Sequence, residues 1–164
     1  MATSFQVEYA YDVPPQALLD VLTDERFLQA RSQRFGGSGD PQVDRSGDRI
    51  VVRIPRQLPV EAVPGALRRF VGDGRLVQTD TWSQTTGDHV EGRWTTDVGG
   101  APLSLQGTHT VDAADRGSRY VVAAEVKVRI PLAGGAAENL IRQRLSELIT
   151  SEQEFAASWL AGQR

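Results

Sequence analysis

The chain has 164 residues, of which 40% are hydrophobic, and it contains no Cys. This length and apolar content indicate a single domain, residues 1–164, with a core large enough to fold without cross-links. The absence of Cys excludes disulfide scaffolds and thiolate metal sites. Because the whole chain has only two His, its composition does not favour a transition-metal site either, and we expect no metal and no cofactor.

The charge distribution indicates which class of molecule the protein binds. Lys and Arg total 18 against 21 Asp and Glu, which gives a net charge of -3. The arginines are scattered and interleaved with acids, as in residues 44–49, whereas nucleic-acid-binding proteins show a basic excess or a basic stripe. We therefore predict no nucleic-acid partner and expect a neutral or apolar one.

The N-terminus and the hydropathy pattern bear on localisation. Residues 1–4 show no basic segment leading into an apolar one, so no secretory signal is expected. No apolar stretch approaches the roughly 18 residues that span a bilayer. These observations predict a cytoplasmic protein without an integral membrane segment, and they leave its oligomeric state open.

The first third of the chain predicts one strand and two short helices. Residues 5–11 alternate bulky and smaller or polar side chains, which is typical of a half-buried strand. Asp12 is a candidate capping residue, and the two prolines after Val13 suit the first turn of a helix over residues 15–22. A second helix is expected over residues 24–31, before a glycine-rich loop.

The middle of the chain predicts an antiparallel meander. Turn-forming residues separate short β-branched segments, as in hairpins. An irregular, partly helical crossover interrupts the pattern between residues 55 and 74. The expected strands are residues 42–44, 49–54, 75–82, 90–97, 103–111 and 120–130.

The C-terminal segment predicts a long amphipathic helix after the glycine pair at residues 134–135. At 100° per residue, its apolar side chains fall on one stripe, which we expect to pack on the sheet. The stripe consists of Ala137, Ile141, Leu145, Leu148, Ile149, Phe155, Ala156, Trp159 and Leu160.

The order of these elements, with two local motifs, resembles a known superfamily. The segment VPPQALLDVLTD at residues 13–24 is similar to the opening of START-like proteins, also called SRPBCC or helix-grip proteins. The segment VKVRIPLAGG at residues 126–135, followed by a helix ending FAASWL, is similar to the close of an uncharacterised, mainly actinobacterial branch. The resemblance covers the whole chain, and its motifs specify the fold better than the chemistry.

The resemblance implies an α+β helix-grip fold, in which a curved antiparallel sheet wraps around the C-terminal helix. Two short helices follow strand 1, and an elongated apolar cavity lies between sheet and helix. Members of this superfamily bind lipids, sterols, polyketides or hormones, and some cyclise or hydrate their ligands. We therefore expect a carrier or sensor of a hydrophobic small molecule, such as a lipid or a polyketide.

Two alternatives stay open. The first is a cyclase- or hydratase-like enzyme in which Glu152, His109 or Asp80 moves a proton on a polyketide-like ligand. The second is a protein-interaction module, which a solid core and a large exposed apolar patch would favour. No nucleophile-base pair or phosphate-binding loop is present to favour the enzyme, so binding without catalysis is the leading hypothesis.

Strand register predicts which side chains face the cavity. A two-residue turn at Gly99 and Gly100 brings two glycines opposite each other, which leaves room for a cavity or for a strongly bent sheet. Closing the next turn with Val111 and Ser118 adds Tyr120 to the same inward face. The predicted pairs are Trp94 with Leu105, Gly92 with Gly107, Val90 with His109, and His109 with Tyr120.

These arguments select the candidate ligand-binding residues. His109 is an imidazole on an apolar face, and is either a ligand contact or a satisfied core residue. The strand of Trp82 can be read with either face inward, and the cost of exposing a Trp favours the inward reading. The crossover, residues 59–71, is expected to cover one entrance. The candidates are Trp82, Trp94, His109, Tyr120, Leu148, Glu152, Phe155 and Phe70.

Glu152 is the anomaly of the helix, because it falls within the apolar stripe. An unpaired carboxylate there would be costly to desolvate. It must either pair with an arginine from the sheet or crossover, or line a hydrated ligand cavity. The sequence leaves both readings open.

Overall fold

The computed structural model describes residues 2–59, 61 and 63–162, with the backbone alone described at residues 84–86. Seven antiparallel strands form one sheet in the order β1-β7-β6-β5-β4-β3-β2. The helices are α1 (Pro15–Leu22), α2 (Glu25–Arg34), α3 (Gly134–Gly162) and the short 3-10 helix η2 (Arg68–Phe70). The strands are β1 (Thr3–Tyr11), β2 (Gln42–Ser46), β3 (Arg49–Gln57), β4 (Arg75–Thr86), β5 (His89–Asp97), β6 (Leu103–Ala114) and β7 (Gly117–Val128).

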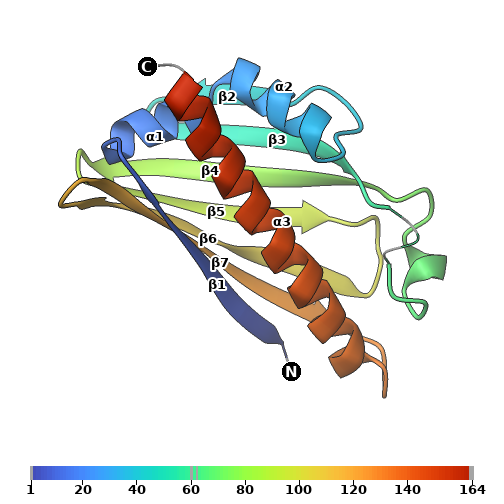
Figure 1. Ribbon diagram of the computed structural model, residues 1–164. Helices are drawn as coiled ribbons and strands as arrows, with labels where there is room; N and C mark the ends of the chain where they lie inside the picture. Colours follow the sequence, from blue (N-terminus) through green and yellow to red (C-terminus); the bar gives the residue numbers. More distant parts are fainter. Residues whose placement is uncertain (1, 60, 62, 163–164) are drawn as a thin grey trace.

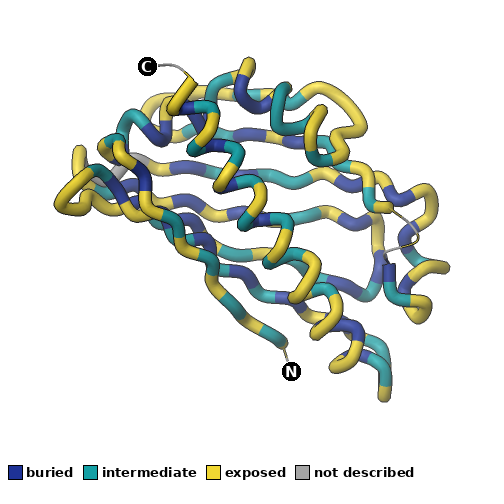
Figure 2. Tube along the Cα trace, in the orientation of Figure 1, coloured by how far each residue is buried: buried dark blue, intermediate teal, exposed yellow. Residues whose placement is uncertain are grey.

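The sheet curves around α3, which crosses its concave face diagonally (Figure 1). Helices α1 and α2 lie at the end of that face where α3 terminates (Figure 1). Buried and exposed residues alternate along most strands (Figure 2), because successive side chains point to opposite faces. The predicted α+β helix-grip architecture is therefore confirmed.

The two short helices begin as their local sequences dictate, with one correction. Pro14, and not Asp12, is the N-cap of α1, because its extended backbone (φ -67°, ψ 162°) leads directly into the helix at Pro15. Asp24 caps α2 by accepting a hydrogen bond from the Arg26 backbone N–H at 2.8 Å. Helix α2 continues to Arg34, three residues beyond its expected end.

The predicted pairing of β5 with β6 is wrong by two residues. The connection is not a two-residue turn, since β5 ends at Asp97 and β6 begins at Leu103. Val98 and Ala101 in this connection are buried against the crossover, and their burial favours the longer loop. The observed pairs are Trp94 with Gly107, Gly92 with His109, and Val90 with Val111.

The pairing of β6 with β7 is offset in the same way, because Ala114 pairs with Gly117 and the turn is two residues long. Tyr120 lies opposite Val111, and His109 opposite Val122. An offset of two residues preserves the face of every side chain. The predicted inward face is therefore confirmed even though the partners differ.

The two inward glycines accommodate indole rings. A Cβ on Gly92 would lie 2.9 Å from Trp82 Cε3, and a Cβ on Gly107 would lie 2.6 Å from Trp94 Nε1. Trp94 Nε1 donates a hydrogen bond across Gly107 to the Ala123 carbonyl at 3.1 Å. The space left by the glycines is thus filled by tryptophan and does not itself form the cavity.

Two apolar clusters form the core. One lies under α1, α2 and the C-terminal half of α3, and it includes Phe27, Trp82 and Tyr120. The other joins the crossover to the N-terminal half of α3, and it includes Leu67 and Val126. No helix among the described residues is both long enough and apolar enough to cross a membrane.

Candidate functional site

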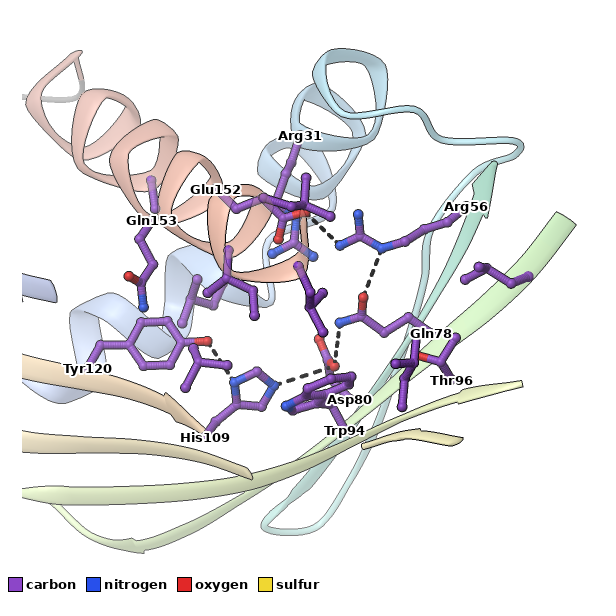
Figure 3. A pocket seen from close by; sticks show the side chains of 18 of the residues that line it. Arg31, Arg56, Gln78, Asp80, Trp94, Thr96, His109, Tyr120, Glu152 and Gln153 are labelled. Carbon is purple, nitrogen blue, oxygen red and sulfur yellow. Dashed lines mark hydrogen bonds and ion pairs between the residues drawn. The ribbon is translucent and has the colours of Figure 1, made fainter. Parts of the chain in front are cut away.

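A cavity of about 110 Å³ lies between the concave face of the sheet and α3. Its wall combines apolar side chains, among them Leu58, Leu76 and Leu105, with polar ones. This position agrees with the predicted apolar cavity between helix and sheet. The polar side chains on its wall are Tyr11, Arg31, Arg56, Gln78, Asp80, Thr96, His109, Tyr120, Glu152 and Gln153, and all but Tyr11 are labelled in Figure 3.

A continuous chain of polar contacts runs from β7 to α3 along this wall, as Figure 3 shows. Inward-facing positions of β7, β6, β4 and β3 supply its members in turn, and Glu152 of α3 completes it. The contacts are Tyr120 Oη to His109 Nδ1 at 2.8 Å, His109 Nε2 to Asp80 Oδ1 at 3.4 Å, Gln78 Nε2 to Asp80 Oδ1 at 2.9 Å, Arg56 Nε to Gln78 Oε1 at 2.8 Å, and Arg56 Nη2 to Glu152 Oε1 at 2.7 Å.

Neighbouring polar and charged side chains keep Asp80 ionised. Burial tends to raise the pKa of Asp80, but the contact with His109 and the charge of Arg31 outweigh it, so the pKa lies below its usual value. Burial raises the pKa of Tyr120 well above normal, which keeps its hydroxyl protonated and able to donate to His109 Nδ1. Nε2 then carries the proton that points towards Asp80.

Glu152 has the arginine partner that one of the two readings of the sequence required. It forms an ion pair with Arg56 of β3, an arginine of the sheet, and each side chain is 13% exposed. It also lies on the cavity wall. The contact is ionic and not an aligned hydrogen bond, since Oε1 has no hydrogen-bond donor within the described part of the chain.

Three further polar side chains on the wall contain buried atoms without hydrogen-bond partners among the described residues. These atoms are Nη2 of Arg31, from α2, Nε2 of His109, from β6, and both amide atoms of Gln153, from α3. Gln153 is only 3% exposed. Its backbone carbonyl accepts a hydrogen bond from Tyr11 Oη at 2.9 Å, and the residue lines the cavity. Unpartnered groups of this kind are typical of a site that receives a polar ligand atom.

Five of the eight predicted ligand-binding residues lie on the cavity wall, namely Trp94, His109, Tyr120, Leu148 and Glu152. The other three lie outside the lining. Trp82 faces inward, as predicted, but stacks on His109 with ring centroids 4.4 Å apart. Phe155 packs against Phe27, and Phe70 against the second core cluster.

Sequence reasoning did not select several polar members of the wall as site residues, among them Arg31, Arg56, Gln78 and Gln153. The period of two that turns Trp82 inward also turns Gln78 inward, and the strand-facing argument could have marked it. Gln153 was not part of the predicted apolar stripe, although it lies against the cavity. The arginines could not be chosen, because their long side chains reach the site from the last turn of a helix and the end of a strand.

Sequence comparisons identify relatives of this chain. A family model described as "Protein of unknown function (DUF2505)" matches residues 6–160. The uncharacterised protein Rv0481c of Mycobacterium tuberculosis is 33% identical over 136 residues, which cover 79% of this chain and 73% of that protein. An uncharacterised protein of Mycobacterium bovis, Mb0491c, matches to the same extent.

Solved structures share the architecture at low sequence identity. A START superfamily protein from Mycobacterium smegmatis matches with a TM-score of 0.55 and 12% identity, covering 97% of this chain and 98% of that one. The Zhui aromatase/cyclase from a Streptomyces species matches with a TM-score of 0.62 and 12% identity, covering 96% and 93%. At these identities the likeness establishes the helix-grip fold and not the chemistry.

Proposed function

Because this chain belongs to the DUF2505 family and has the helix-grip fold of START-like proteins, we propose that it binds a hydrophobic small molecule, as a carrier or sensor, between the sheet and α3. The observation that carries the proposal is the cavity of about 110 Å³, which is lined by apolar side chains together with a set of polar groups. Small-molecule sites commonly combine these two features.

Packing supports the same proposal. The aromatic side chains of Trp82 and Phe155 pack against neighbouring residues outside the cavity lining. Their rings therefore do not fill the cavity. A protein-interaction module would need a solid core instead. The cavity therefore favours a small-molecule ligand over that alternative.

The test is to ask whether apolar molecules occupy the cavity. Native mass spectrometry with organic extraction of freshly purified protein should recover an apolar compound. A titration with ethylbenzene, followed by two-dimensional NMR, should shift the amide signals of Leu148 and Ile149, which line the cavity.

A filled cavity provides the matched control. Ala156 lines the cavity and is 1% exposed, so Ala156→Leu should weaken ethylbenzene binding by about tenfold or more. Ala161→Leu, at an exposed position of the same helix, should leave it unchanged. Equal ethylbenzene affinity in all three proteins would contradict the proposed site.

One observation favours the enzyme alternative as a second candidate. Tyr120, His109 and Asp80 are in contact on the cavity wall, and two of them have displaced pKa values. Such clusters are enriched at catalytic sites. In that case His109 is the group that would exchange a proton with the ligand, because its Nε2 lines the cavity without a hydrogen-bond partner among the described residues. The proposal of binding without catalysis does not require this step.

A further inference from the structure

The charges on the cavity wall already balance. Among the described lining residues, Arg31 and Arg56 are cationic and Asp80 and Glu152 are anionic. Glu152 pairs with Arg56 at 2.7 Å, and the charge of Arg31 acts on Asp80 closely enough to contribute to its lowered pKa. A ligand bringing a net charge would add an uncompensated charge to a buried site, which is costly. The balance therefore favours a neutral ligand.

The unpartnered atoms indicate the polar groups that such a ligand presents. The Gln153 side chain is 3% exposed and lies at the cavity, with neither its N–H donors nor its carbonyl oxygen engaged by the described residues (Figure 3). A side-chain amide offers a donor and an acceptor next to each other. The ligand group that matches it presents a hydrogen-bond acceptor next to a donor. Arg31 Nη2 adds a further donor on the same wall.

The volume limits the buried part of the ligand. A cavity of about 110 Å³ is somewhat smaller than the apolar cavity of about 150 Å³ that holds benzene in another protein. The enclosed part of the ligand is therefore about the size of one six-membered ring. A ligand larger than one ring would extend beyond this cavity.

We infer that this cavity selects a neutral ligand whose buried end is a ring-sized apolar group bearing a carboxamide or lactam, held by the side-chain amide of Gln153 and by Arg31. This inference rests on the proposed function, because it specifies the head group of the same ligand. It assigns Gln153 to ligand recognition, a role that its position at the edge of an apolar helix stripe did not suggest.

The test compares three probes that differ only in the group attached to a benzene ring: benzamide, benzoate and ethylbenzene. Calorimetry and NMR titration of the full chain should show benzamide binding about tenfold more tightly than either of the others. Gln153→Leu should lower the affinity for benzamide by about tenfold and change that for ethylbenzene by less than about twofold. Gln143→Leu, at an exposed position of the same helix, should change neither.

The outcomes separate the inference from the proposed function. Benzoate binding as tightly as benzamide would overturn the neutral head group, and unchanged benzamide affinity in Gln153→Leu would overturn the role of Gln153. If Gln153→Leu fails to fold, Gln153→Met provides the same comparison. Failure of all three probes, ethylbenzene included, would overturn the proposed cavity function and the inference together.

Discussion

Single residues on the cavity wall carry charges too deeply placed to be solvated by water alone. Glu152 and Arg56 are each 13% exposed and lie 2.7 Å apart, and Arg56 also donates to Gln78. Removing one member of such a pair leaves the other partly buried without its counter-charge. The pair therefore sets the position of the polar wall relative to α3, since one member belongs to the sheet and the other to the helix.

Truncating Glu152 should lower the stability of the folded protein. We expect Glu152→Ala to lower the free energy of unfolding by about 2 to 3 kcal/mol, and Glu152→Gln by less, because the amide oxygen still presents a partial negative charge to Arg56. Urea denaturation measures both. Glu154→Ala, at an exposed position of α3, is the control. Equal stability of Glu152→Ala and this control would show that the ion pair contributes nothing.

Asp80 should make stability depend on pH in a defined direction. Its pKa in the folded protein lies below the usual 3.8, where burial is outweighed by His109. The folded state therefore binds this proton less readily than the unfolded state. The stability that Asp80 contributes is fully present above the unfolded pKa and is lost as the pH falls through the folded pKa.

Asp80→Asn removes this contribution. Urea denaturation at about pH 7 and about pH 3 should show a larger loss of stability on acidification in the wild-type protein than in the variant. Because other carboxylates titrate in both proteins, the difference between the two profiles is the measured quantity. Parallel profiles would indicate that Asp80 has the same pKa in both states.

At the scale of structural elements, the crossover between β3 and β4 borders the cavity. Its described residues include the 3-10 helix η2, and Leu67 within it is fully buried. Leu58 and Leu76, at its two ends, line the cavity. We therefore keep the prediction that this segment covers one cavity entrance.

Hydrogen exchange tests this role of the crossover. Saturating ethylbenzene should slow amide exchange in residues 63–71, because a filled cavity stabilises the packing of Leu67 and Val71 against the second core cluster. Residues 42–50, in the hairpin of β2 and β3, serve as the internal reference. Unchanged exchange in the crossover, with the cavity occupied, would rule out a covering role.

At the scale of the whole molecule, the two apolar clusters are connected by residues that pack against both. Phe5 of β1 and Leu145 of α3 pack against both clusters, and β1 is further tied to α3 by the hydrogen bond from Thr3 Oγ1 to Glu138 Oε1 at 2.9 Å. Glu138 also accepts a hydrogen bond from the Val128 backbone N–H, which, as the largest cause, lowers its pKa. These connections link the two clusters, and the single domain over residues 1–164 stays a prediction.

Local patterns in the sequence determined the order of elements, the boundaries of α1 and the face on which Tyr120, Trp94 and His109 lie, because each of these follows from spacing along the chain. Tertiary structure alone decided the strand register, since burial of Val98 and Ala101 lengthens the β5–β6 loop. It also decided the polar wall. Arg31, Arg56, Gln78 and Gln153 come from four elements distant in sequence, and only the folding of sheet, α2 and α3 around one cavity brings their side chains together.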